Sequence, residues 1–382
     1  MKKKKLIVGI TAPQSIILLK GQLSYFNNKG FDVFLMSPKT EDVVAFCKAE
    51  GATLLPIKIE REISVIKDVK SVLRIIQIFK NIRPDIINLG TPKVSLLGMI
   101  AGKICGVPAR VYTCRGFRFE HETGFFRKLL IACERVTAKF SHKVLAISNS
   151  VRELGIKERV FNEDKSLVIN YGSSNGVDLR LFRREDISGE EILDLKKDLK
   201  VESKFVFGYV GRLIRRKGFE ELYSAFKKMY ESDKDLRLVV CGKPYYDQID
   251  ERIISEAKSH PGVIMTGLVP YEQVPLYMSI FDVFVLPAYW EGFGNVLVQA
   301  AAMGIPVIST KVTGCKDAVS DKFNGELISP KSEQDLMAAM EKMKQSPELR
   351  DKYGENGLKW SKNFQGEIIW KGMENLFSSL EQ

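Results

Sequence analysis

The chain alternates short β-rich runs with helical runs, and it does so twice along its 382 residues. Repeated strand–helix alternation predicts parallel strands that are covered by helices on both faces. A chain of this length exceeds one ordinary hydrophobic core and suits two domains with a cleft. We therefore expect an α/β protein made of two doubly wound, Rossmann-like domains that face each other across a cleft.

Each half supplies its own series of strands. In the first half we expect strands at Lys5–Ile10, Asp32–Ser37, Thr53–Ile57, Ile86–Leu89, Arg110–Thr113, Lys143–Ile147 and Leu167–Ile169. In the second half the corresponding runs are Phe205–Val210, Leu236–Cys241, Val263–Thr266, Val283–Leu286, Val307–Ser309 and Glu326–Ile328. The polar stretch from Ser173 to about Ser203 is the best domain boundary. We expect one Rossmann-like domain over residues 1–185, a second over 186–362, and a further helix over 363–382.

Positive charge is concentrated in the first half. The net charge of +11 divides into +15 for residues 1–185 and −4 for residues 186–382. An anionic membrane face and nucleic acid are both reasonable partners for such a surface, and a solvated lysine-rich surface is the alternative. The first half also contains two apolar and basic stretches, at residues 64–80 and 125–132, which suit either core helices or docking on a membrane.

The composition of the chain indicates the cellular compartment in which the protein works. No apolar run is long enough to cross a bilayer, and the basic N-terminus leads into a predicted strand rather than a full signal-peptide core. The six cysteines are scattered without a C-x-x-C pair, and three histidines make a zinc site unfavourable. We expect a cytoplasmic protein in a reducing compartment.

Residues 287–306 form the most informative motif. A buried strand is followed by Glu291, by the loop Gly292-Phe293-Gly294-Asn295, and by a helical run that starts near Val296. A helix N-terminus directs backbone N–H groups and a partial positive charge at a phosphate. Gln299 follows Glu291 by about 12 Å along the axis and about 80° around it. The two side chains could therefore hold an elongated ligand whose phosphate lies at the helix end.

A basic loop follows the first strand of the second half. The segment Gly211-Arg212-Leu213-Ile214-Arg215-Arg216-Lys217-Gly218 lies at the carboxyl end of Phe205–Val210. Arg212 offers a planar fork of donors and Lys217 a compact charge, which together suit a diphosphate. The segment is neither a Walker loop nor a G-x-G-x-x-G loop. Because parallel sheets bind ligands at the carboxyl ends of their strands, we expect this loop and residues 287–306 to line one site.

Together these two motifs resemble the C-terminal half of the family 4 retaining glycosyltransferases, which have the GT-B fold. The resemblance extends over nearly the whole chain and includes Gly267-Leu268-Val269 and Asn324-Gly325. The segments around Lys20 and around Arg115-Gly116-Phe117-Arg118-Phe119-Glu120 resemble members that build bacterial capsule or O-antigen repeats on a lipid carrier.

The resemblance implies an acceptor-binding domain over residues 1–185, a donor-binding domain over 186–362, and a helix over 363–382 that crosses back to the first domain. A lipid-linked acceptor would place the protein peripherally on the inner face of the plasma membrane. The resemblance also implies a role for each motif. It implies that Arg212 and Lys217 hold the donor diphosphate and that Glu291 contacts hydroxyls of the donor sugar. Backbone around Gly211 and Gly292–Val296 would meet the phosphate and the sugar, and Gly267–Val269 would lie against the nucleobase. The expected reaction transfers a sugar from a UDP-sugar to an undecaprenyl-diphosphate-linked sugar with retention, and N-acetylfucosamine is one donor sugar that the resemblance suggests.

Two positions depart from the family pattern. The second glutamate of the usual pair is Gln299 here, and its amide oxygen can still accept bonds from the ribose, although without charge. Many relatives have a histidine where this chain has Arg115. The candidates for binding the acceptor are Lys20, Arg115, Arg118, Glu120 and His121.

We expect no metal cofactor, because Arg212, Lys217 and a helix end can neutralise the diphosphate. The only Asp-x-Asp, at residues 233–235, falls in a polar turn rather than at a strand end. One alternative keeps the donor site but uses a soluble acceptor. A nucleic-acid-binding protein is a distant alternative, because interleaved aromatics and a recognisable binding motif are missing and the two cleft motifs would stay unexplained.

Overall fold

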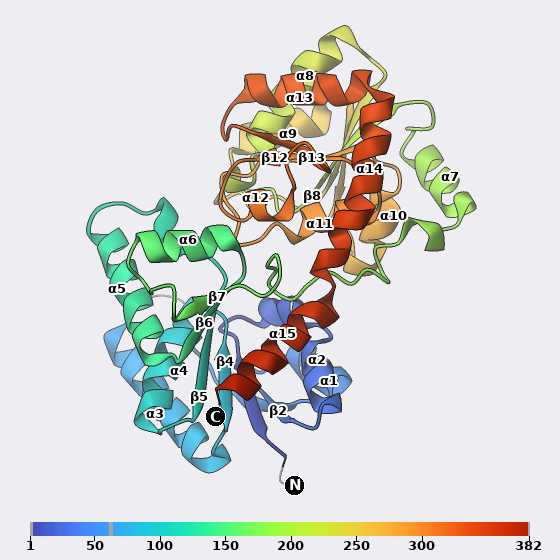
Figure 1. Cartoon of the computed structure of the whole chain (residues 1–382). Helices are drawn as coiled ribbons and strands as arrows, with labels where there is room; N and C mark the ends of the chain where they lie inside the picture. The colour runs from blue at the N-terminus through green and yellow to red at the C-terminus, as the bar shows by residue number, and fades with distance from the viewer. Residues whose placement is uncertain (1–2, 61–63, 381–382) are drawn as a thin grey trace. The chain divides into compact units, whose positions relative to one another are not determined.

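The computed structural model describes residues 3–60 and 64–380, which form two compact units. Unit 1 contains the chain up to Gly176 together with the segment from Gly366, and unit 2 is Val177–Gln365 (Figure 1). The chain thus passes from unit 1 to unit 2 between Gly176 and Val177, nine residues before the expected boundary at 185/186. Residues 177–185, which we expected in the first domain, belong to unit 2, and the Val177 N–H donates there to the Phe364 carbonyl (2.7 Å).

Unit 1 is built on a seven-stranded parallel sheet with the order β3-β2-β1-β4-β5-β6-β7. Its strands are β1 (Lys5–Gly9), β2 (Asp32–Ser37), β3 (Thr53–Pro56), β4 (Ile86–Leu89), β5 (Ala109–Cys114), β6 (Lys143–Ala146) and β7 (Ser166–Leu167). Every neighbouring pair is parallel. The strand order reverses between β1 and β4, which is the switch point of the sheet.

Helices cover both faces of this sheet, and each face has its own apolar core. On one face α3 (Val65–Ile82), α4 (Pro92–Ile104), α5 (Gly124–Phe140) and α6 (Asn149–Lys157) pack around buried residues such as Phe79 and Phe117. On the other face lie α1 (Gln22–Asn28), α2 (Glu41–Glu50) and α15 (Gly366–Ser379), around Phe26 and Phe377. Figure 1 shows the red α15 beside α1 and α2. The C-terminal helix is therefore part of the core of unit 1.

Unit 2 repeats the topology with a six-stranded parallel sheet in the order β10-β9-β8-β11-β12-β13. The strands are β8 (Phe205–Val210), β9 (Leu236–Cys241), β10 (Val263–Gly267), β11 (Val283–Leu286), β12 (Val307–Thr310) and β13 (Gly325–Ile328). The helices are α7 (Gly189–Asp198), α8 (Phe219–Ser232), α9 (Glu251–Ser259), α10 (Val274–Met278), α11 (Asn295–Ala302), α12 (Cys315–Ala318), α13 (Glu333–Gln345) and α14 (Pro347–Ser361). Its switch point lies between β8 and β11, where the loops that carry the two sequence motifs begin. The expected pair of Rossmann-like domains is confirmed.

The stretch Ser173–Ser203, in which we expected the domain boundary, contains both the crossing from unit 1 to unit 2 at Gly176/Val177 and helix α7. Ser188 accepts from the N–H of Glu191 and Glu191 accepts from the N–H of Ser188, so the helix begins with a capping box. This short-range signal is present in the sequence and outweighs the low apolar content of the stretch.

Candidate nucleotide-sugar site

Two loops at the switch point of unit 2 are held against each other by backbone contacts. Gly218 has a φ of 72°, and a Cβ at this position would lie 2.0 Å from the carbonyl oxygen of Pro287. The N–H of Tyr289 also donates to the carbonyl of Arg216 (2.8 Å). Only glycine allows both the left-handed conformation and this approach. The basic loop after β8 is thereby fixed to the loop after β11.

A buried charge cluster occupies the place where these loops meet. The Lys217 ammonium forms an ion pair with Glu291, and Nη1 of Arg216 lies 3.8 Å from Oε1 of Glu291. Glu291 is only 9% exposed. The Arg216 guanidinium stacks 4.5 Å from the centre of the Trp290 ring, and burial lowers its pKa while Glu291 opposes that shift. Two cations share one carboxylate, so the cluster has excess positive charge.

Arg212 adds a second cation on the same loop. Its side chain is exposed, and its guanidinium lies 5.8 Å from the centre of the Tyr245 ring. Its carbonyl accepts from the hydroxyl of Tyr209 (3.0 Å), which fixes the backbone where the loop leaves β8. Among residues 3–60 and 64–380, no carboxylate forms an ion pair with Arg212. The guanidinium is therefore able to bind an anion.

The glycine-rich loop that follows Glu291 is held by a third segment, the loop after β12. The N–H of Glu291 donates to the carbonyl of Thr313 (3.0 Å), and a Cβ on Gly314 would lie 2.4 Å from the carbonyl oxygen of Glu291. The Phe293 ring is buried 5.4 Å from that of Phe364. Gly292 and Gly294 flank this anchor, and α11 begins at Asn295, directly before Val296. The N-terminus of α11 thus follows the charge cluster by a few residues.

Gln299 lies on α11 and contacts the loop after β10. Its Nε2 atom donates to the hydroxyl of Tyr271 (3.4 Å), and burial raises the pKa of Tyr271 to about 12. A neutral tyrosine hydroxyl can accept this hydrogen bond. The contact uses the amide nitrogen of Gln299 and leaves the amide oxygen as an acceptor for another donor. Gly267 ends β10 with a φ of 74°, and its carbonyl accepts from the N–H of Gly242 (2.7 Å). Val269 follows it, partly buried, on the same carboxyl edge of the sheet.

The acceptor-side candidates of unit 1 lie on two segments, one at the end of the first 3-10 helix (Pro13–Leu19) and one after β5. Lys20 is exposed, and its carbonyl accepts from Asn175. Arg118 pairs with Glu122 (3.6 Å) and lies over the ring of Phe126, whereas the Arg115 guanidinium lies against Gly90. Glu120 and His121 belong to the same short 3-10 helix as Arg118, which is anchored by the stacked rings of Phe117 and Phe119 (4.7 Å).

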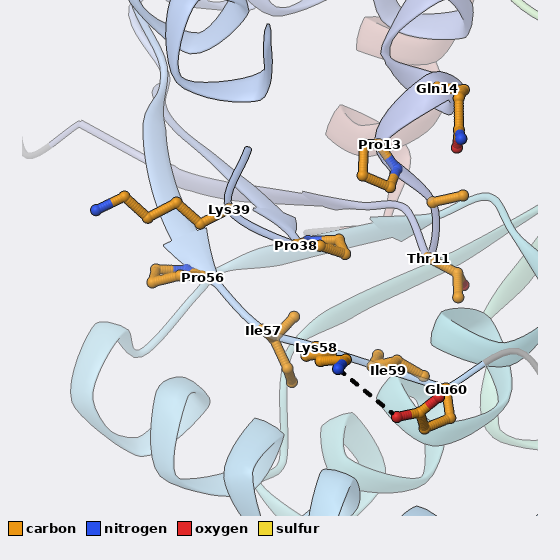
Figure 2. Close-up of a pocket in the computed structure, with 11 residues that line it drawn as sticks. Thr11, Pro13, Gln14, Pro38, Lys39, Pro56, Ile57, Lys58, Ile59 and Glu60 are labelled. Atoms are coloured by element: carbon orange, nitrogen blue, oxygen red, sulfur yellow. Dashed lines mark ion pairs between the residues drawn. The ribbon is translucent and has the colours of Figure 1, made fainter. Parts of the chain in front are cut away.

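A cavity of about 700 Å³ lies at the carboxyl ends of β1, β2 and β3 in unit 1. Figure 2 shows its lining, in which Pro13 and Pro38 follow β1 and β2, and Pro56 ends β3. Lys39 and Lys58 add two cations, and Lys58 lies 3.9 Å from Glu60. The cavity combines walls of proline and isoleucine with two lysines.

Comparison with known proteins places the chain in a family. Residues 191–360 match the model of group 1 glycosyl transferases, and residues 10–148 match a glycosyl transferase 4-like model. The chain is 33% identical to the capsular polysaccharide biosynthesis glycosyltransferase CapM of Staphylococcus aureus, over 99% of this chain and 98% of that protein. The chain belongs to the family 4 glycosyltransferases.

Further relatives of this glycosyltransferase agree with that assignment. An Escherichia coli UDP-Gal:alpha-D-GlcNAc-diphosphoundecaprenol alpha-1,3-galactosyltransferase is 29% identical, with 79% of this chain and 77% of the relative covered. Among solved structures, Anabaena Alr3699/HepE in complex with UDP and glucose superposes with a TM-score of 0.83 at 19% identity, over 98% of this chain and all of that one. The last comparison establishes the shared fold.

One residue of the charge cluster was missed by the sequence reasoning. Arg216 stands beside Lys217 in the quoted motif, but nothing in the motif distinguishes it from the exposed Arg215. Its burial against Trp290 and Glu291 depends on the loop after β11, which is some 70 residues away in the chain. Sequence spacing alone gives no signal for such a contact.

Within the described part of this glycosyltransferase, no group of three or more His, Cys, Asp or Glu side chains could hold a metal ion. Asp233 and Asp235 of the Asp-x-Asp segment pair with Lys344 and Lys204. Among residues 3–60 and 64–380, no helix is both long and apolar enough to cross a membrane.

Proposed function

We propose that the chain transfers a sugar from a UDP-sugar to an undecaprenyl-diphosphate-linked sugar during the synthesis of a capsular or surface polysaccharide. The observation that carries this proposal is the cation cluster of Arg212, Arg216 and Lys217 at the switch point of unit 2, beside the buried Glu291. The relatives named above support the lipid-linked acceptor. The resemblance to capsule-type members suggests an N-acetylated amino sugar, such as N-acetylfucosamine, as the donor sugar.

In this proposal the donor diphosphate binds to Arg212 and Lys217, and the first turn of α11 faces its phosphate or sugar. Negative charge develops on the departing UDP, so preorganised cations provide the largest catalytic term and no metal is required. The acceptor hydroxyl attacks C1 of the sugar from the side of the leaving group, and its proton passes to the leaving phosphate as the C1–O bond breaks. The configuration at C1 is then retained.

Glu291 and Gln299 position the donor. The Glu291 carboxylate accepts from hydroxyls of the sugar, and Lys217 keeps that carboxylate in place when the site is empty. Gln299 accepts from the ribose through its amide oxygen, because its nitrogen is bonded to Tyr271. The backbone of Gly267 and Val269 borders the nucleobase. The family resemblance implies each of these roles, and the place of these residues on the carboxyl edge of unit 2 supports them.

We further propose that unit 1 docks on the inner face of the plasma membrane. Ile66, Val69 and Leu73 form an exposed stripe on α3, with exposed fractions of 73%, 54% and 60%, among the basic residues Lys67 and Lys70. An apolar stripe with flanking lysines suits an anionic lipid surface. Co-sedimentation with anionic vesicles at low salt should fall when Ile66 and Leu73 are replaced by serine, and an unchanged bound fraction would reject this surface.

The transfer reaction is tested with a panel of UDP-sugars and lipid-linked monosaccharides, with products identified by mass. We expect one donor to be transferred by the wild type, and Lys217→Ala or Arg212→Ala to reduce the rate by about 100-fold or more. Arg215→Ala is the matched control, since this exposed arginine of the same loop only approaches Glu220 at 4.0 Å. Near-normal turnover of both Lys217→Ala and Arg212→Ala would overturn the assignment.

A further inference from the structure

Arg115 stands at the carboxyl edge of unit 1, one strand away from the switch point. It is the first residue after β5, and β4 is the neighbouring strand. Gly90 is the first residue after β4. Across the switch point the N–H of Thr11 donates to the Thr91 hydroxyl (2.8 Å), which joins the ends of β1 and β4. Open parallel sheets bind their ligands at this place.

The Arg115 guanidinium lies directly over Gly90. A Cβ at Gly90 would lie 2.8 Å from Nε and 3.2 Å from Nη2 of Arg115, so glycine is needed for the side chain to take this position. Nη1 points to the carbonyl of Ser174, at a long 3.4 Å. The arginine is thus placed by two backbone segments rather than by a partner of opposite charge.

Two polar atoms at and beside the Arg115 guanidinium make no hydrogen bond. The Nε atom of Arg115 and the hydroxyl of Ser174 are both buried and lack a hydrogen-bond partner. Among residues 3–60 and 64–380, Nη1 is the one nitrogen of the guanidinium that donates a hydrogen bond. Buried polar atoms without partners are few in native proteins, and they mark places where a ligand or water belongs.

The charge of Arg115 is also uncompensated. No carboxylate within residues 3–60 and 64–380 forms an ion pair with it, although other cations of unit 1 are paired, as Lys93 is with Asp68 and Arg127 with Glu158 (2.8 Å each). Burial lowers the pKa of Arg115 to about 10, so the side chain remains positive at neutral pH at a cost in desolvation. A bound anion would offset that cost.

We propose that Arg115, with Ser174, forms an anion subsite that takes a phosphate group of the acceptor. A planar guanidinium binds phosphate through paired N–H donors, and a serine hydroxyl can add one more bond. The proposal rests on the function proposed above, in which the acceptor sugar is linked to a lipid through a diphosphate. The donor's own diphosphate is the other source of the same chemistry, and the experiment below distinguishes the two.

The experiment compares two acceptors that differ only in carrying a diphosphate or a monophosphate between sugar and lipid. For the wild type we expect kcat/KM to favour the diphosphate by about 10-fold or more, as a charge-assisted bond implies. In Arg115→Met, KM for the diphosphate acceptor should rise by about 10-fold and the preference should disappear. Arg115→Lys should keep part of it. Lys103→Met, which removes an exposed charge elsewhere in unit 1, should change neither value.

Two direct titrations complete the test. The affinity for UDP should be the same in Arg115→Met and in the wild type, whereas binding of geranyl diphosphate should be lost in the variant. A weakened UDP affinity with an unchanged acceptor KM would assign Arg115 to the donor and overturn the proposal, as would unchanged kinetics with both acceptors. If the wild type transfers no sugar, the proposed function fails, and geranyl diphosphate binding that depends on Arg115 still supports the subsite.

Discussion

The two sheets share the order of their first six strands, but the cations at their carboxyl edges have different partners. In unit 2, Lys217 and Arg216 are paired with the buried Glu291, and three loops hold one another through backbone contacts. In unit 1, Arg115 has no paired carboxylate among the described residues and rests on Gly90. The same topology therefore supports a preorganised charge cluster in one unit and an uncompensated cation in the other. The loops, rather than the sheets, determine the chemistry of each edge.

The largest expected difference between the two edges concerns their glycines. Gly218→Ala would place a Cβ 2.0 Å from a backbone oxygen in a left-handed conformation, and we expect a loss of about 3 kcal/mol or more in the stability of unit 2. Gly90→Ala meets only the movable side chain of Arg115, and about 1 kcal/mol is expected. Denaturant unfolding and hydrogen exchange resolved by unit measure both effects.

The outcome also tests how each edge is held. Equal and small losses would mean that the loops of unit 2 move freely past each other. A large loss of stability for Gly90→Ala would mean that the Arg115 side chain cannot move away from the added Cβ.

A buried carboxylate of unit 1, Glu134, should make the stability of this unit depend on pH. Glu134 on α5 accepts from the hydroxyl of Tyr112 (2.6 Å), and burial raises its pKa from 4.5 to about 7. Between these values the folded state holds a proton that the unfolded state has released. Stability from this group is therefore complete below about pH 4.5 and is lost as the pH rises through 7.

For the wild type we expect this group to lower the free energy of unfolding by about 3 kcal/mol between pH 4.5 and pH 8. Glu134→Gln has no such proton to lose, so its stability relative to wild type should increase across the same interval. Denaturant unfolding of both proteins at several pH values measures the difference. A constant difference would show that Glu134 is ionised throughout.

The smallest expected effect concerns Gln299. Its amide nitrogen donates to Tyr271, and its oxygen is proposed to accept from the ribose. Gln299→Glu introduces the carboxylate that the family resemblance implies at this position, and Tyr271 can donate to it. We expect UDP to bind about two- to five-fold more tightly, since hydrogen bonds to a charged acceptor are stronger. A weaker affinity would show that the Gln299 nitrogen is needed by the ligand.

The sequence predicts the fold because the strand and helix signals are local. The strands of both sheets lie at the apolar runs that alternate with helical runs in the sequence. Gly218 and Gly292 predict tight loops after strands. The contacts that define the site are not local. The pairing of Lys217 with Glu291 joins positions 74 residues apart, and the burial of Arg216 depends on Trp290. Likewise, the arginine at 115 is visible in the sequence, whereas its position over Gly90 and its lack of an ion pair require the folded sheet.

The central claim is that the charge cluster of unit 2 binds a nucleotide diphosphate, and a calorimetric titration with UDP tests it most directly. The wild type should bind UDP at a single site. Lys217→Met should weaken that affinity by about 10-fold or more, as loss of a charge-assisted contact implies, while Arg215→Met and Arg115→Met leave it unchanged. Equal affinity in the wild type and in Lys217→Met, or no binding of UDP by the wild type, would contradict the account.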